Sequence, residues 1–160
     1  MKSKGATSEV LKKRRRTLIR FDPMNPAITV FNSRYLRPRM VYVLRADKLI
    51  HYKKGRSRIV YVGETSRGTK RPAGSAASKA RMAFRALHGV GRIDVHPLTF
   101  RGKQNVRLWE VLERDLLSTF KDVYGEIPCY NQQGKGKKFS TDRIKYFRPS
   151  RLKRIVALLS

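Results

Sequence analysis

The sequence predicts an α+β fold in which a small antiparallel three-stranded sheet is flanked by helices. Short runs rich in β-branched and aromatic residues occupy positions 40–44, 58–63 and 93–100, and polar or glycine-containing segments separate them. Apolar residues recur at helical spacing after the second and third runs. A length of 160 residues is enough for one such domain with basic extensions at both ends.

The first two runs are expected to form a hairpin. They read MVYVL at 40–44 and RIVYVG at 58–63, and the polar stretch between them contains Gly55, which predicts a long basic tip. The third run, at 93–100, includes Pro97. Because proline cannot donate to a strand ladder, this run is predicted to be an edge strand or to end at the proline.

Three segments have the pattern of helices. Residues 75–88 carry alanines and larger apolar side chains at helical spacing, and glycines follow them. Residues 105–122 form the strongest prediction, and residues 149–159 a shorter helix with one apolar side. The apolar stripe of the strongest helix consists of Trp109, Leu112, Leu116 and Phe120.

The segments outside the folded domain are basic. Residues 1–38 are predicted to be a basic arm and connector, residues 39–133 the folded domain, and residues 134–160 a basic loop with a short C-terminal helix. The predicted phosphate contacts in these extensions are Lys12, Lys13, Arg14, Arg15, Arg16, Lys135, Lys137 and Lys138.

The charge of the chain indicates its class of partner. Lysine and arginine number 38 against 11 acidic residues, a formal net charge of +27, which is far more than solubility requires. Such a field favours a polyanion. No apolar run approaches the ~18–20 residues of a membrane span, so nucleic acid is the better candidate. On charge alone, a ribosomal-type RNA-binding protein explains the composition as well as an enzyme does.

Cysteine usage and the N-terminus bear on the compartment. Cys129 is the only cysteine, so one chain can build neither a disulfide framework nor a cysteine zinc site. The N-terminus lacks the apolar stretch of a secretory signal. We therefore expect a cytoplasmic protein, associated with the nucleoid in a prokaryote. In a eukaryote we expect a nuclear protein, with the KKRRR run as a nuclear localisation signal.

Glu113 has an unusual place on the strongest predicted helix. At 100° per residue it falls between Leu117 and Phe120, inside the apolar arc, whereas Asp115 and Asp122 are predicted to face solvent. An ionised carboxylate on a packing face is costly unless cations or donors compensate it. Two interpretations follow: a salt bridge to an arginine, or a metal-holding carboxylate beside a phosphate.

Tyrosines and basic residues accompany this carboxylate. Tyr42 and Tyr61 each stand between valines in the first two strands, where tyrosine is common as a packing residue. Arg81, Arg85 and His88 lie along one margin of the helix that follows. Taken separately, a solvated basic flank explains these three equally well.

Together the motifs resemble those of the GIY-YIG endonuclease family. The order is VYV, then VYVG ending at Gly63, then an arginine-bearing helix, then LE-x-x-LL around Glu113, and finally P-x-YN ending at Asn131. The resemblance covers about residues 39–133 and implies that family's form of the three-stranded α+β fold. The first motif departs from the pattern, with MVY in place of GIY, and the segment from Glu113 to Asn131 is longer than in excision-repair nucleases.

The resemblance implies a metal-dependent endonuclease that hydrolyses phosphodiester bonds in DNA. Glu113 would hold Mg²⁺, with Mn²⁺ as an alternative, and water and phosphate would complete an oxygen shell. Tyr42 would be the general base or would orient the attacking water, and Tyr61 would hold water or phosphate beside it. His88 is a candidate proton relay, and Asn131 completes the catalytic set.

The catalytic arginine has several candidates. The usual spacing after the second tyrosine would select Arg71, but Pro72 and Gly74 indicate that the helix has not yet begun there. We therefore predict that Arg81 stabilises the transition state, with Arg85 as second choice, and that Arg71 contacts a phosphate.

The expected partner is double-stranded DNA, and the size of the chain favours a stand-alone restriction, phage or mobile-element nuclease. One active centre cuts one strand, so double-strand cleavage requires a homodimer or sequential nicks. Two alternatives stay open: a non-catalytic nucleic-acid-binding relative of the family, and a ribosomal-type RNA-binding protein. The sequence leaves the choice between DNA and RNA open.

Overall fold

A three-stranded antiparallel sheet with the order β2-β1-β3 forms the centre of the fold. The computed structural model describes residues 37–101, 107–131 and 146–160, all within one compact unit, Ser33–Ser160. The α+β fold predicted from the sequence is confirmed. Its elements in chain order are β1 (Met40–Tyr52), β2 (Gly55–Thr65), α1 (Lys70–Ala86), β3 (Ile93–Leu98), α2 (Leu108–Tyr124) and α3 (Pro149–Leu159).

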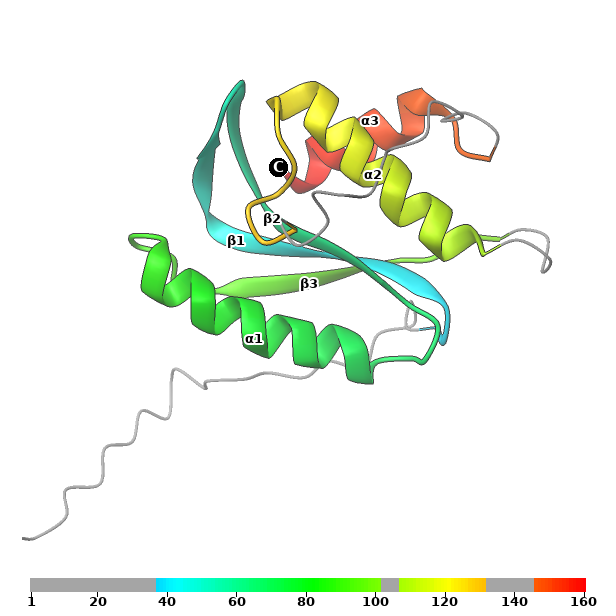
Figure 1. Cartoon of the computed structure of the whole chain (residues 1–160), viewed down its shortest axis with the longest axis horizontal. Coiled ribbons are helices and arrows are strands. Elements are labelled where there is room, and N and C mark those ends of the chain that lie inside the picture. Colours follow the sequence, from blue (N-terminus) through cyan, green and yellow to red (C-terminus); the bar gives the residue numbers. More distant parts are fainter. Residues whose placement is uncertain (1–36, 102–106, 132–145) are drawn as a thin grey trace, which may run out of the picture. The chain divides into compact units, whose positions relative to one another are not determined.

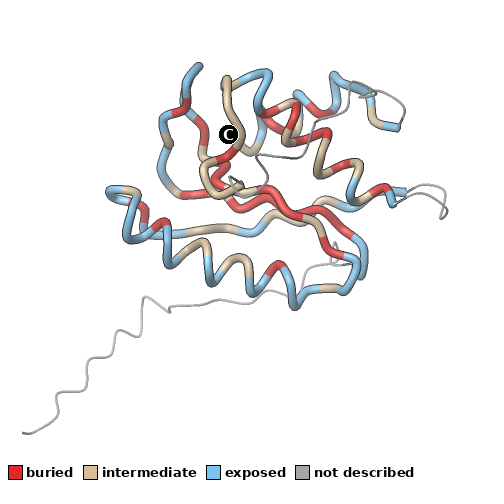
Figure 2. Tube along the Cα trace, in the orientation of Figure 1, coloured by how far each residue is buried: buried red, intermediate tan, exposed pale blue. Residues whose placement is uncertain are grey.

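The helices cover both faces of the sheet, with α1 on one side and α2 and α3 on the other (Figure 1). Alternate side chains of β1 point to opposite faces. Val41 and Val43 therefore pack toward α2 and α3, while Tyr42 and Leu44 pack toward α1. Figure 2 shows that burial follows the central strands and the inner side of α2. Among the described residues, no helix combines the length and apolar character needed to cross a membrane.

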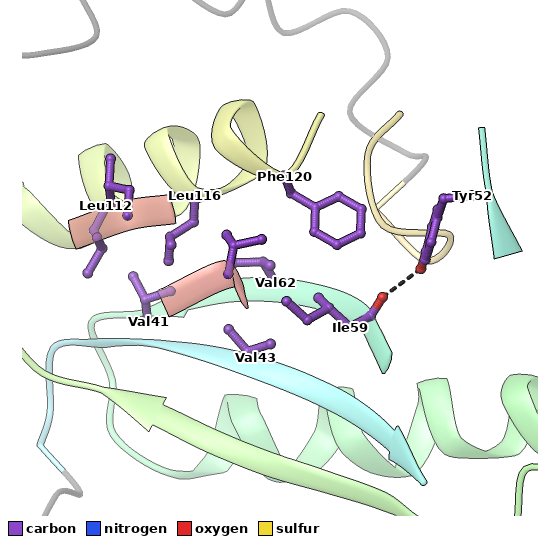
Figure 3. Packing of buried hydrophobic residues seen from close by; sticks show 10 residues of the cluster. Val41, Val43, Tyr52, Ile59, Val62, Leu112, Leu116 and Phe120 are labelled. Carbon is purple, nitrogen blue, oxygen red and sulfur yellow. Dashed lines mark hydrogen bonds between the residues drawn. The ribbon is translucent and has the colours of Figure 1, made fainter. Parts of the chain in front are cut away.

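The β1–β2 hairpin is longer than predicted, because both strands continue through the expected basic tip. Tyr52 pairs with Gly55, so only two residues form the turn. Tyr52 is buried and its hydroxyl donates to the carbonyl of Ile59 at 2.6 Å. Its ring lies 5.0 Å from that of Phe120 in an edge-on arrangement (Figure 3). This packing against α2 orders a stretch that is polar in sequence.

The larger of the two cores lies between the sheet and the helices α2 and α3. Figure 3 shows β-branched residues of β1 and β2 meeting the inner side of α2. Leu152 and Val156 of α3 belong to this core, so the predicted C-terminal helix is part of the folded unit. Its buried members are Val41, Val43, Tyr52, Ile59, Val62, Leu112, Leu116, Phe120, Leu152 and Val156.

Helix α1 begins five residues before the predicted start at Ser75, with Lys70 as its first residue. Pro72 lies in the first turn, where its missing N–H costs no helical hydrogen bond. Gly74 is exposed and has open space around the position of a Cβ. The prediction failed because proline and glycine were interpreted as helix breakers, although the first turn tolerates a proline and an exposed position in the second turn tolerates a glycine.

The buried side of α2 is wider than the predicted stripe. Asp122 is exposed as expected, but Asp115 was predicted to face solvent and is only 4% exposed, with Arg114 Nε 3.5 Å from its Oδ1. Helix α2 contacts α3 as well as the sheet. Its buried arc therefore includes Asp115 and Ser118 together with Leu112.

Candidate active site

The two strand tyrosines meet over a glycine. Tyr42 of β1 is paired with Gly63 of β2, and Tyr61 precedes Gly63 by two residues, so all three lie on the same face of the sheet. The rings of the two tyrosines are 6.1 Å apart. A Cβ at Gly63 would lie 2.6 Å from Cε1 of Tyr61 and 2.7 Å from Cζ and the hydroxyl oxygen of Tyr42. Only glycine leaves room for both rings.

Tyr42 has no exposed surface, and its hydroxyl lies 2.8 Å from Oγ of Ser75 in α1. In this structure it has no access to solvent water. This placement does not support the predicted role of Tyr42 in activating or orienting the attacking water, because a general base must reach the proton that it removes. It favours a positioning role, in which Tyr42 fixes α1 and the neighbouring ring of Tyr61.

Tyr61 is the tyrosine of this pair that reaches the surface. Partial burial raises its pKa to about 12, with further contributions from Tyr42 and the carboxylate of Glu113, while Arg71 acts in the opposite direction. The phenol is therefore protonated at neutral pH and can donate a hydrogen bond. Lys79 Nζ lies 5.5 Å from the centre of its ring.

Arg71 is the arginine that the structure brings to the tyrosines. Its Nη1 lies 3.7 Å from Oε1 of Glu64, and 59% of its side chain is exposed. Partial burial lowers the pKa of Arg71, but Glu64, Tyr42 and Tyr61 more than offset this effect, so the pKa is raised. Arg71 therefore stays charged beside the two phenols.

The other predicted residues lie farther along the chain, Arg81 and Arg85 in α1 and His88 in the turn after it. All three are exposed. Tyr42 contacts Ser75, near the N-terminal end of α1. At a rise of 1.5 Å per residue, Arg81 is roughly 15 Å beyond Arg71 along the axis. The sequence favoured the end of α1 that is distant from the tyrosines, because the start of the helix was predicted at Ser75 and not at Lys70.

Glu113 of α2 is partly buried and contributes to the raised pKa of Tyr61. Its carboxylate therefore acts electrostatically on the phenol even though α2 and α1 cover opposite faces of the sheet. β2 is an outer strand of the sheet and packs against α2, which explains how the two residues come within range. Of the two sequence interpretations of Glu113, neither is excluded by this placement.

Asn131 has a structural position on β2. Its Oδ1 accepts a hydrogen bond from the backbone N–H of Val62 at 2.8 Å, and its Nδ2 donates to the carbonyl of Val62 at 2.6 Å. The N–H of Tyr130 donates to the carbonyl of Val60 at 3.0 Å. Asn131 therefore satisfies the backbone groups of Val62 at the outer edge of β2, between Tyr61 and Gly63.

A cationic hollow of about 550 Å³ adjoins Arg71. The loop between β2 and α1 shapes it, because Thr65 Oγ1 accepts from the N–H of Arg67 at 3.0 Å and donates to the carbonyl of Gly68 at 3.2 Å. The φ of Gly68 is 74°, a conformation that favours glycine. Among the residues that the structure describes, no carboxylate lines the hollow, so it suits a phosphate. Its lining consists of Thr65, Ser66, Arg67, Lys70 and Arg71.

The donor set around Glu113 fits only a substrate-assisted magnesium site. Within the described residues, no three side chains of the types His, Cys, Asp and Glu cluster as metal ligands. Mg²⁺ commonly uses one or two carboxylates and takes its remaining oxygens from water and substrate phosphate. Glu113, which acts electrostatically on Tyr61, could supply one such carboxylate. A preformed protein cage is not seen in this part of the chain.

The predicted phosphate contacts in the basic extensions lie outside the described residues; they are Lys12, Lys13, Arg14, Arg15, Arg16, Lys135, Lys137 and Lys138.

Comparison of the chain with protein-family models, curated proteins and solved structures gave no match.

Proposed function

We propose that the protein is a divalent-metal-dependent endonuclease that hydrolyses phosphodiester bonds in DNA. The observation that carries the proposal is that Glu113 and Arg71 both act electrostatically on Tyr61, while Arg71 also lines a hollow of cations and hydroxyls. The resemblance of the strand and helix motifs to those of GIY-YIG nucleases supports it. The net charge of +27 suits a polyanionic substrate.

Each group has a role in this proposal. A phosphate in the hollow would be held by Lys70 and Arg71, and Arg71 would stabilise the charge that develops on its oxygens. Glu64 orients Arg71 through their ion pair. Tyr61, protonated at neutral pH, would donate a hydrogen bond to the attacking water or to a phosphate oxygen.

Glu113 would hold the metal ion, Mg²⁺ in the first instance and Mn²⁺ as an alternative. When bound, the ion supplies charge neutralisation at the scissile phosphate. Tyr42 contributes by position, because its hydrogen bond with Ser75 holds α1, and with it Arg71, against β1 and β2. The proposed role of Tyr42 is therefore different from the one that the resemblance implies.

The test is cleavage of supercoiled plasmid and of end-labelled DNA and RNA by the full chain, with Mg²⁺ or with a chelator. We expect cleavage of DNA that requires the metal. Glu113→Gln should abolish it, since the charge that attracts the metal is lost while the shape is kept, and DNA binding should persist. A folded Glu113→Gln protein that still cuts DNA in Mg²⁺ would contradict this proposal.

A second pair of variants tests the arginine. Arg71→Ala should reduce cleavage by ~100-fold or more, as expected for the loss of a transition-state donor. Arg81→Ala is the matched control on the same helix, exposed and roughly 15 Å away along the axis, and should cleave at nearly the normal rate. Equal effects of the two substitutions would show that Arg71 acts only as a general phosphate contact.

Full burial of Tyr42 favours a second function, that of a non-catalytic nucleic-acid-binding protein. In that case the phosphate hollow would bind DNA or RNA without hydrolysis. Fluorescence anisotropy of labelled DNA separates the two functions. Tight, salt-sensitive binding with no cleavage under any divalent metal would establish the second function and reject the first.

A further inference from the structure

A second hollow of about 440 Å³ adjoins the phosphate hollow and shares Ser66 with it. Unlike the first, it combines an aromatic ring, cations and carboxylates. Its volume lies within the range of small-molecule sites, about 300–1,000 Å³. The lining residues are Arg39, Glu64, Ser66, Arg107, Trp109 and Glu110.

The aromatic wall of this hollow is made by Trp109 together with Arg39. The guanidinium carbon of Arg39 lies 5.0 Å from the centre of the indole ring. Trp109 is only partly buried, although the sequence pattern placed it on the same stripe as the buried Leu112. Indole rings and guanidinium planes are the surfaces on which unpaired nucleobases stack in nucleic-acid-binding proteins. A nucleobase can therefore stack on this wall.

The polar groups of the hollow supply both a donor and an acceptor. Nη1 of Arg107 donates to Oε1 of Glu110 at 3.1 Å, and both side chains are largely exposed. Such an exposed ion pair contributes little to stability, so its members can exchange partners at low cost. Arginine recognises O6 and N7 of guanine. A carboxylate accepts hydrogen bonds from the neighbouring N1–H and N2 amino group of the same base.

We propose that this hollow binds an unpaired guanine base of the nucleic-acid substrate, next to the nucleotide whose phosphate occupies the Arg71 hollow. Guanine is the base that offers acceptors to Arg107 and adjacent donors to Glu110 while its ring stacks on Trp109 and Arg39. The inference rests on the proposed function in assuming a nucleic-acid substrate. It adds a base-recognition site, which gives the protein a sequence preference.

The only tryptophan of the chain lies in this hollow, so its fluorescence reports occupancy directly. The full chain is titrated with guanosine, adenosine, cytidine and uridine monophosphates and with ribose 5-phosphate. We expect saturable quenching by the guanosine nucleotide at concentrations at least tenfold lower than for the others. Ribose 5-phosphate, which keeps the charge but lacks a base, should leave the emission nearly unchanged.

Two variants assign the effect to the hollow. Glu110→Gln should weaken binding of the guanosine nucleotide about tenfold, as expected for one lost charge-assisted contact, with little change for the others. Asp122→Asn, an exposed carboxylate near the other end of α2, is the matched control and should bind normally. Circular dichroism establishes that both variants are folded.

The titration separates this proposal from the proposed function. Quenching that does not distinguish the four bases, or a Glu110→Gln protein that keeps the guanosine preference, overturns the guanine site even when the protein binds and cuts DNA. Replacing deoxyguanosine by deoxyinosine, whose base lacks the 2-amino group, in a single-stranded oligonucleotide should weaken binding to the Glu113→Gln protein. A preference for free guanosine nucleotide in a protein that cuts no DNA would instead reject the nuclease and retain the site.

Discussion

Replacement of Gly63 by alanine is the most direct test of how the two tyrosines are arranged. The new methyl group would lie 2.6 Å from Cε1 of Tyr61 and 2.7 Å from two atoms of Tyr42, well inside van der Waals contact. The side chain of Tyr42 cannot move aside easily, because it is fully buried and its hydroxyl is hydrogen-bonded to Ser75. Overpacking of this kind costs about 1–3 kcal/mol of unfolding free energy. For a domain of this size each kcal/mol lowers Tm by roughly 2–8 °C.

The measurement is thermal and urea unfolding of the two proteins, followed by a cleavage assay at a temperature where both are folded. Gly74→Ala is the matched control, since a Cβ there meets nothing within 4 Å. It should be neutral or stabilising by up to ~1 kcal/mol, because alanine is the better helix former. A Gly63→Ala protein as stable as the original, with normal cleavage, would refute the close packing of Tyr42 and Tyr61 over this strand.

Four further outcomes follow from the structure. Tyr42→Phe should lower the unfolding free energy by ~1 kcal/mol through loss of its hydrogen bond, and urea unfolding will measure it. Tyr61→Phe should leave unfolding nearly unchanged and reduce cleavage by ~100-fold; normal cleavage would remove Tyr61 from the mechanism. Partial burial lowers the pKa of His96 in the folded protein, so neutral His96 contributes stability that is complete above about pH 6.5 and is lost as the pH falls further. His96→Gln should therefore flatten the Tm–pH curve below pH 6.5, and an unchanged curve would contradict this effect of His96. Burial also raises the pKa of the Cys129 thiol, so iodoacetamide should modify it slowly at pH 8 until denaturant is added, and rapid native labelling would count against its burial.

The sheet and its two faces could be predicted from the sequence because they depend on local alternation. The valines on either side of Tyr42 point to one core and Tyr42 to the other, as a period of two requires. The extent of the hairpin could not be predicted in this way. Its outer half is ordered by the ring of Tyr52 against Phe120 and Tyr124. Those contacts join residues about seventy positions apart, which a local pattern does not reveal.

The site was predicted less completely than the fold. The motifs indicated the tyrosines and Glu113, which the structure brings within electrostatic range of one another, but Arg81 was preferred to Arg71 because Pro72 was interpreted as evidence against a helix. A proline in the first turn is compatible with a helix start, so the same observation could have placed Arg71 at the site. The hollow beside Trp109 had no signal in the sequence. Its lining residues come from three segments, and the spacing of Trp109 indicated only its packing against the core, which the structure also shows.

Strand order explains why two similar motifs have different environments. Both tyrosines stand between valines in the motif VYV, so the local sequence gives no reason to distinguish Tyr42 from Tyr61. β1 is the central strand, flanked by β2 and β3 and covered by α1, and Tyr42 is therefore enclosed completely. β2 is an outer strand, so Tyr61 keeps an exposed side where Arg71 and Glu113 act on it. A sheet in which the order of these strands was exchanged would expose the first tyrosine instead. The environment of each phenol is thus set by long-range topology, which encloses Tyr42 in the core and leaves Tyr61 partly exposed.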